Sequence, residues 1–283
     1  MTQPPDIADP QALRRNRRRA VTGAASDPFV HLEARDELHH RLAEVNRRFT
    51  RPAVICGLPG VWADFLPGAK VVPDDPLLAL EPGAHDLVIH AMALHWAADP
   101  VGQLIQARRA LCPDGLFLGV LFGGQTAAEA RAALAQAEAA LTGGLSPRVL
   151  PMAEIRDLGA LLQRAGLALP VADSVTLRAS YRDMRHWAAD LRAMGEGNAM
   201  TARNRGPAPR ALFQQAETLW RAHYPAPDNR LLATFELIFL TGWAPDASQP
   251  QPLRPGTATH RLAEALETRE TPLPEAIKIP RDD

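Results

Sequence analysis

Apolar residues alternate along the chain between short continuous runs and longer segments with helical spacing. The continuous runs lie at residues 53–56, 71–72, 86–92, 116–122, 167–177 and 234–243. A near-continuous run such as 86–92 is typical of a strand that is buried on both faces of a parallel sheet. Helical spacing is found at residues 28–45, 100–111, 126–141, 155–165, 182–194 and 208–224. This alternation predicts βαβ units with right-handed crossovers, which bind ligands at the carboxyl ends of their strands.

The pattern also indicates how the chain is divided. We expect residues 28–245 to form one α/β domain with a doubly wound sheet, and the two helices within 182–224 to be an insertion that covers it. Residues 1–27 are polar and are expected to be flexible, with the arginines of 14–19 forming a solvated face. Prolines and polar residues predict an extended tail over 246–283, with one short helix near 262–266.

Composition narrows the class of partner. The 283 residues carry a net charge of -1, which lacks the broad positive potential of nucleic-acid binders, so a small molecule or a protein is the expected partner. Cys56 and Cys112 lie in or beside apolar stretches, as buried reduced thiols do. No apolar run is long enough to span a membrane. We therefore expect a soluble, cytoplasmic protein.

Two groups of residues stand where nucleotide-binding sheets hold their ligand. Gly57 and Gly60 follow the first strand, where glycines let a backbone approach a ligand closely, but Pro59 removes a donor, and an ordinary strand-ending turn is the alternative. Asp74 or Asp75 follows the second strand and could accept hydrogen bonds from a ribose, unless both are surface turn residues. The segment 76–85 is too short for a crossover helix and a strand, so one βα unit is missing.

Histidines mark the end of the third strand. His95 could serve as an acid or base or could be structural, and His90 is better explained as a buried structural residue. The histidines show no zinc-binding spacing, so we expect no metal site. Nucleophile-elbow and P-loop motifs are also absent.

From residue 86 onward the motifs become specific. Four of them resemble the second half of class I S-adenosylmethionine-dependent methyltransferases: Asp86-Leu-Val, Leu94-His95-Trp96, Asp99-Pro100 and Leu111-Cys-Pro-Asp-Gly115. Others are similar to the mitochondrial complex I assembly factors of methyltransferase-like fold and their bacterial relatives: Phe122-Gly-Gly-Gln-Thr126, Gly143-Gly-Leu-Ser-Pro147, Asp157-Leu-Gly-Ala-Leu-Leu-Gln-Arg-Ala-Gly166, Asp190-Leu-Arg-Ala-Met-Gly-Glu-Gly-Asn198 and Thr241-Gly-Trp243. The resemblance covers roughly residues 10–265.

This resemblance implies a class I methyltransferase-like, Rossmann-like fold whose last strand runs antiparallel, with a helical insertion. It implies S-adenosylmethionine as the cofactor, an acceptor side that includes Trp96 and Asn198, and His95 as the proton acceptor. The implied cofactor contacts are Gly57, Gly60, Asp74, Asp75, Ala91 and Met92. The implied partner is a protein, possibly a complex I subunit.

The first half departs from the family pattern. Ile55 stands where an acidic residue is expected, Leu58 and Pro59 replace part of the glycine pattern, and the shortened segment 76–85 would normally contact the adenine edge. We therefore expect S-adenosylmethionine to bind weakly or not at all.

Three functions remain open. The first is a methyltransferase-like protein that modifies or binds a protein partner during complex I assembly, and the resemblance also admits arginine hydroxylation. The second is a non-catalytic assembly factor or chaperone that has lost the cofactor. The third is a carrier-protein methyl ester synthase of biotin synthesis, to which Leu191-Arg-Ala-Met-Gly195 and the final strand show a more distant likeness.

Overall fold

The computed structural model describes residues 7–23, 27–250, 262–265 and 267–269. The chain divides into two units, Met1–Ala247 and Ser248–Asp283. The second unit contains one described helix, α9 (Leu262–Ala265), in the region where we expected a short helix. Among the described residues no helix is both long and apolar enough to cross a membrane.

A single six-stranded sheet forms the centre of the first unit, in the order β2-β1-β3-β4-β6-β5. Its strands are β1 Pro52–Cys56, β2 Lys70–Val72, β3 His85–Ala91, β4 Leu111–Phe122, β5 Ala168–Tyr181 and β6 Leu231–Trp243. Strands β2, β1, β3 and β4 pair in parallel, and β6 runs antiparallel to both β4 and β5. The chain thus has the class I methyltransferase-like fold, and the expected antiparallel final strand is confirmed.

The burial of each strand follows its place in the sheet. All residues of β1 and β3 are buried, because both strands lie inside the sheet with helices on each face. Strand β5 lies at the edge, and its residues alternate between half-buried and exposed. Continuous apolar runs therefore predicted the central strands correctly.

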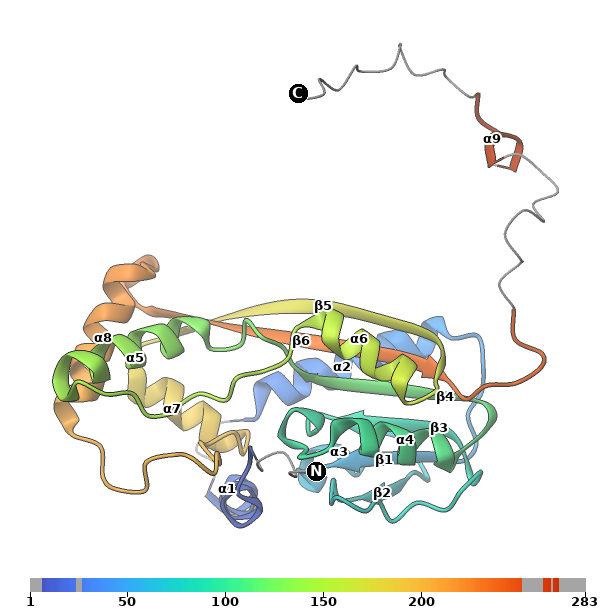
Figure 1. The fold of residues 1–283 in the computed structure, drawn as a ribbon, viewed down its shortest axis with the longest axis horizontal. Helices are drawn as coiled ribbons and strands as arrows, with labels where there is room; N and C mark the ends of the chain where they lie inside the picture. The colour runs from blue at the N-terminus through green and yellow to red at the C-terminus, as the bar shows by residue number, and fades with distance from the viewer. Residues whose placement is uncertain (1–6, 24–26, 251–261, 266, 270–283) are drawn as a thin grey trace, which may run out of the picture. The chain divides into compact units, whose positions relative to one another are not determined.

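Helices cover both faces of the sheet (Figure 1). They are α1 Pro10–Gly23, α2 Phe29–Glu44, α3 Pro59–Trp62, α4 Pro100–Ala110, α5 Ala128–Thr142, α6 Ile155–Arg164, α7 Met184–Ala193 and α8 Arg210–His223, with 3-10 turns η1 Leu94–Trp96 and η2 Pro227–Asn229. One core joins α2, through Val30 and Leu38, to one face of the sheet. A second core joins α4 and α6, through Leu104 and Leu162, to the other. The sheet is therefore doubly wound, as expected.

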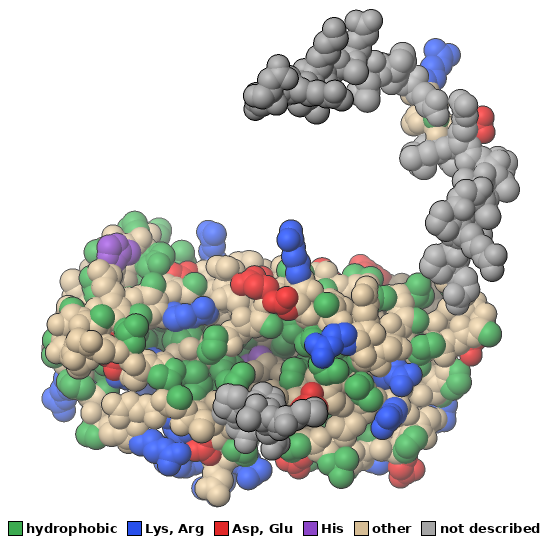
Figure 2. All heavy atoms as spheres, viewed as in Figure 1, with side chains coloured by type: hydrophobic (Ala, Val, Ile, Leu, Met, Phe, Trp, Pro, Cys, Tyr) green, Lys and Arg blue, Asp and Glu red, His purple; other side chains and the backbone are tan. Residues whose placement is uncertain are grey.

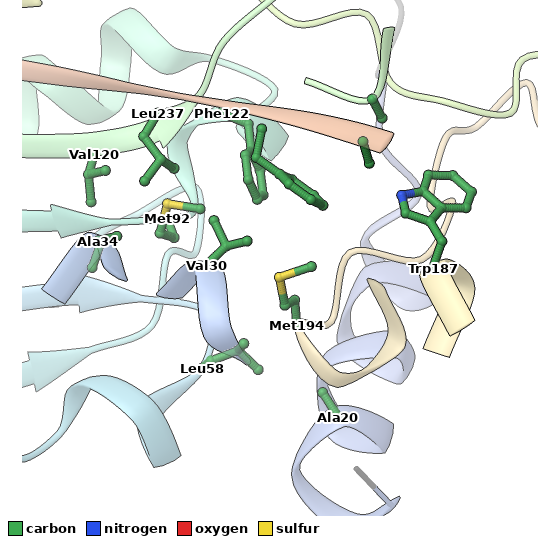
Figure 3. Close-up of a cluster of buried hydrophobic side chains, with 14 of the residues drawn as sticks. Ala20, Val30, Ala34, Leu58, Met92, Val120, Phe122, Trp187, Met194 and Leu237 are labelled. Atoms are coloured by element: carbon green, nitrogen blue, oxygen red, sulfur yellow. The ribbon is translucent and has the colours of Figure 1, made fainter. Parts of the chain in front are cut away.

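The helical insertion lies beyond the carboxyl ends of the parallel strands. Figure 1 shows α5, α7 and α8 gathered at that end of the sheet, and α5 packs against α8. Close to them, Figure 3 shows Trp187 of α7 together with Met194, Ala20 and Phe122 at one end of the buried cluster. This placement is the one we expected for residues 182–224.

The N-terminal segment differs from the expectation of a flexible, polar stretch, because residues 10–23 form α1. Buried Ala12, Leu13 and Ala20 attach this helix to the domain. The carboxylate of Asp9 accepts hydrogen bonds from the backbone N–H groups of Gln11 and Ala12 and so caps the helix. The apolar face of this helix was not recognised in the sequence, because arginines outnumber the apolar residues in this segment.

The βα unit expected to be missing is absent from the described residues. Between Val72 and His85 the chain forms neither a helix nor a strand, and β2 is the outermost strand of the sheet. Helix α5 begins at Ala128, and its N-cap residue Ala127 makes no side-chain hydrogen bond. The Glu129 carboxylate instead accepts hydrogen bonds from the backbone N–H and the hydroxyl of Thr234, which ties α5 to β6.

Candidate functional site

The predicted site residues come together at the carboxyl ends of three neighbouring strands. Gly57 follows β1, Asp74 and Asp75 follow β2, and Ala91 ends β3. The 3-10 turn η1, which carries His95 and Trp96, comes a few residues later. Parallel strands that end at one edge of a sheet bring such residues together even though the sequence separates them.

Arg17 of α1 occupies the space next to Gly57. Its Nη1 donates to Asp74 Oδ1 at 2.6 Å, and the two side chains are only 13% and 9% exposed. A Cβ atom placed on Gly57 would lie 2.2 Å from Arg17 Cζ, so the guanidinium rests against the glycine backbone. Because Gly57 lacks a side chain, the guanidinium has room to reach Asp74.

While Arg17 is in this position, Gly57 and Asp74 do not fit S-adenosylmethionine. Arg17 takes both the space above Gly57 and the carboxylate of Asp74, which were two of the expected anchors of the cofactor. Gly60 is exposed, and a Cβ there would meet nothing within 4 Å, so no close backbone approach requires this glycine. Asp75 is part of the same turn, where its carbonyl accepts a hydrogen bond from Gln103 Nε2 at 3.3 Å. Beside Arg17 a cavity of about 370 Å³ remains on the nucleotide side, and Arg17, Asp74 and Asp75 line it.

Ala91 and Met92, the remaining expected cofactor contacts, are almost fully buried. Met92 has a φ of 47°, and its backbone N–H donates to the carbonyl of Val120 at 2.8 Å. Its side chain belongs to the cluster drawn in Figure 3, together with Leu237 and Val30. Both residues therefore contribute to the core of the domain.

Glu196 joins His95, the expected proton acceptor, to Trp96, which we assigned to the acceptor side. Its Oε2 lies 3.2 Å from His95 Nε2 and accepts a hydrogen bond from Trp96 Nε1 at 2.7 Å. Burial would raise the pKa of this carboxyl, but the nearby His95 and His31 and two hydrogen bonds outweigh it and hold the pKa below its usual value. The side chains of His95 and Glu196 are 1% and 7% exposed. The arrangement keeps a carboxylate inside the protein.

Four nitrogen atoms around this carboxylate and Arg17 are buried without a hydrogen-bond partner in the described residues: Arg17 Nη2, His31 Nε2, His90 Nδ1 and His95 Nδ1. Burial lowers the pKa of His31 to about 4 and also lowers that of His90. His90 Nε2 lies 2.6 Å from Gln103 Oε1, which agrees with the structural role expected for it. Buried groups of this kind are usually satisfied by a ligand or by ordered water.

A cavity of about 310 Å³ opens on the acceptor side of Glu196. Trp96, Glu196 and Asn198 line it, as do four aromatic residues: Phe122, Trp187, Phe213 and Phe235. We call this cavity the aromatic chamber. Figure 2 shows this face of the molecule hollowed near its centre, where hydrophobic side chains gather. Asn198 is held at the rim by a 2.8 Å hydrogen bond from its Nδ2 to the carbonyl of Pro147.

Sequence reasoning missed Arg17, Glu196 and Trp187. Glu196 stands between Gly195 and Gly197 in a stretch without regular structure, and a lone acid between glycines was the signal that could have marked it. Arg17 had no such signal, because it is one of five arginines in 14–19 and only the packing of α1 selects it.

No group of three or more His, Cys, Asp or Glu side chains within the described parts of the chain could hold a metal ion. Both cysteines are free, and Cys56 is buried. Burial, together with the charge of Asp74, raises the pKa of the Cys56 thiol to about 12, so it stays protonated and is a poor nucleophile.

Several curated proteins are similar to this chain in sequence, whereas no family model matches it. The human protein named arginine-hydroxylase NDUFAF5, mitochondrial, is 34% identical over 199 residues, which are 70% of this chain and 57% of that protein. Malonyl-[acyl-carrier protein] O-methyltransferase of Laribacter hongkongensis is 32% identical over 188 residues, 66% of this chain and 61% of that enzyme. The chain thus spans less than two thirds of the length of these relatives.

A search of solved structures finds the YcgJ protein of Bacillus subtilis, with a TM-score of 0.48 and 12% sequence identity, covering 76% of this chain and 99% of that one. From its strand order the chain has the class I methyltransferase-like fold, and the NDUFAF5 proteins and the malonyl-[acyl-carrier protein] O-methyltransferases are among its homologues.

Proposed function

We propose that this chain is a complex I assembly factor that binds an arginine side chain of a protein partner in the aromatic chamber. The observation that carries the proposal is the Glu196 carboxylate, which is held inside a chamber lined with aromatic rings. The NDUFAF5 relatives are named arginine-hydroxylases, which supports arginine as the bound residue.

The chemistry of the chamber suits a guanidinium. Glu196 Oε2 is used by His95 and Trp96, while no hydrogen bond within the described residues engages Oε1. A guanidinium can donate to such an oxygen and stack on the faces of aromatic rings such as Trp96 and Trp187. Charge-assisted hydrogen bonds are strong where water is excluded, so one carboxylate can select arginine over a neutral side chain.

The nucleotide side of the site supports a function in which the protein binds its partner without transferring a methyl group. Arg17 fills the space at Gly57 and pairs with Asp74, so the protein holds its pocket together with its own side chain. We propose that partner binding needs no S-adenosylmethionine. We also propose a cytoplasmic location, for which the two free cysteines are the support and cell fractionation is the test.

The test combines cells and purified protein. In cells that lack this protein, wild type is expected to restore assembled complex I on native gels, and the variant Glu196→Gln is expected to fail. Purified wild type should bind N-acetylarginine amide more tightly than N-acetylleucine amide, and Glu196→Gln should remove that preference because it removes the charge. The proposal is wrong if Glu196→Gln, folded as well as wild type, restores complex I fully.

A second function, methyl transfer from S-adenosylmethionine, is favoured by one observation. The buried nitrogens of Arg17, His31 and His95 lack hydrogen-bond partners within the described residues, and a polar ligand bound beside them would supply these partners. The malonyl-[acyl-carrier protein] O-methyltransferase homologues agree with this function. Low-micromolar binding of S-adenosylmethionine to the wild-type protein would establish it in place of cofactor-free binding.

A further inference from the structure

A large groove lies on the surface between α7 and α8. Its volume is about 710 Å³. Met184, Ala188 and Phe213 form apolar parts of its wall, and Phe213 is 41% exposed to solvent. An exposed aromatic side chain in a groove of this size is typical of a surface that binds another protein segment.

The groove is positively charged. Arg185, Arg192 and Arg210 line it, are exposed, and have no ion-pair partner among the described residues. The fourth lining arginine, Arg221, forms an ion pair with Glu217, which is the only acidic residue of the lining. Three uncompensated positive charges along an apolar wall match an acidic segment that also carries apolar residues.

The groove continues into the aromatic chamber. Trp187, Ala188, Arg192 and Phe213 line both. Trp187 is 6% exposed and forms part of the wall that the groove and the chamber share. A peptide that lies in the groove can therefore reach the chamber with one side chain.

We infer that the groove between α7 and α8 binds an acidic, partly apolar stretch of the partner, and that this stretch directs a neighbouring arginine into the chamber. The inference rests on the proposed function for the arginine, whereas the acidic stretch follows from the charges of Arg185, Arg192 and Arg210 alone. The recognised partner segment is thus one arginine flanked by aspartate, glutamate and leucine-like residues.

The experiment uses three fluorescent peptides of about ten residues and the full-length protein. The first has a central arginine with acidic and leucine flanks, the second has the same arginine with serine and leucine flanks, and the third has the acidic flanks with leucine in place of arginine. Fluorescence anisotropy measures their affinity. The charge reversal Arg185→Glu/Arg210→Glu is expected to weaken binding of both acidic peptides at least about tenfold and to leave the serine peptide unchanged.

The matched control reverses two exposed arginines of α6, Arg156→Glu/Arg164→Glu, which lie outside both cavities and should leave all affinities unchanged. If Arg185→Glu/Arg210→Glu keeps the thermal stability of wild type and binds the acidic peptides as tightly as wild type does, the groove inference is overturned. Tighter binding of a single-stranded RNA of equal charge than of the acidic peptide would also overturn it.

The variant Glu196→Gln separates this inference from the proposed function. It should weaken the two arginine peptides and spare the leucine peptide, while the groove variant weakens both acidic peptides. If Arg185→Glu/Arg210→Glu weakens binding of the acidic peptides but Glu196→Gln does not weaken binding of the arginine peptides, the groove inference stands and the arginine proposal is wrong. If only Glu196→Gln weakens binding, the arginine proposal stands and the groove inference is wrong.

Discussion

Arg17 places a guanidinium between Gly57 and the carboxylate of Asp74. Its side chain is 13% exposed, so the ion pair is poorly screened by water and by salt. An arginine cannot lose its charge in a protein, and its removal would leave Asp74 buried without its counter-ion. The Asp74 carboxylate therefore needs either Arg17 or a ligand that donates hydrogen bonds to it.

The variant Arg17→Ala tests this competition. It removes the atoms next to Gly57 and frees Asp74 to accept hydrogen bonds from a ribose, so we expect S-adenosylmethionine to bind Arg17→Ala at least about tenfold more tightly than wild type. Isothermal titration calorimetry measures both affinities. Arg18→Ala, at an exposed position of the same helix, is the control and should behave as wild type. Equal affinity of Arg17→Ala and wild type would show that Arg17 does not block the cofactor.

His31 gives the stability of the protein a pH dependence. Its pKa falls from 6.5 to about 4 in the folded protein because the ring is buried, and Trp62 Nε1 donates to its Nδ1. The unfolded chain therefore takes up a proton at a higher pH than the folded chain does. The stabilisation is complete above about pH 6.5 and is lost as the pH falls toward 4.

We expect the free energy of unfolding of wild type to fall by about 2 kcal/mol from His31 between about pH 7 and about pH 5. The variant His31→Gln, whose amide oxygen can still accept from Trp62, should lose this part of the decline. Urea unfolding at the two pH values measures it, with exposed His40→Gln as the control. An identical pH decline in His31→Gln and wild type would contradict the assignment to His31.

Helix α1 connects the two sides of the site. Besides Arg17, it contributes Asn16, whose Nδ2 donates to the carbonyl of Gly197 at 2.8 Å, next to Glu196. At its start, Asp9 caps the helix and pairs with Arg203 at 2.9 Å. The helix is thus attached to the segment that holds Glu196 and Asn198.

The variant Asp9→Ala should loosen α1, because it removes both the helix cap and the partner of Arg203. We expect faster hydrogen exchange of the α1 amides, measured by mass spectrometry, with unchanged exchange in α2. The control Asp27→Ala changes an exposed acid that precedes α2 and should leave α1 protected. If the α1 amides exchange equally in Asp9→Ala and wild type, other contacts hold the helix.

The whole domain depends on two cores, one on each face of the sheet. The core with Phe122 and Trp187 borders the chamber, whereas Leu162 belongs to the core formed with α4 and α6. Because β3 and β4 are buried on both faces, the domain needs both cores to fold. A substitution in the second core can therefore lower stability without touching the site.

We expect Leu162→Ala to lower the free energy of unfolding by about 2–5 kcal/mol, since Leu162 is 0% exposed and its loss leaves a cavity. Leu141→Ala, at a residue 44% exposed, should change stability by no more than about 0.5 kcal/mol. Urea unfolding measures both, and the affinity for the acidic arginine peptide should be the same in each folded variant. Weaker peptide binding by folded Leu162→Ala would show that the far core shapes the chamber.

The sequence by itself determined the order of the six strands, the order of the long helices between residues 28 and 224, and the loss of the unit between Val72 and His85. These features depend on local patterns of apolar residues and on segment length, which the chain carries independently of its fold. The order of the strands also predicted that Gly57, Asp74, His95 and Trp96 lie at one edge of the sheet, because the carboxyl ends of parallel strands meet there.

Only the tertiary structure decided which charged residues enter the site. Arg17 is separated from Asp74 by 57 positions, and Glu196 from Trp96 by 100, so neither pair leaves a local pattern. Arg17 and exposed Arg18 are neighbours in one helix, and the angle between successive side chains sends one to Asp74 and the other to solvent. Long-range packing of α1 and of the segment after α7 fixed which side of the helix faces the site, and with it the chemistry of the site.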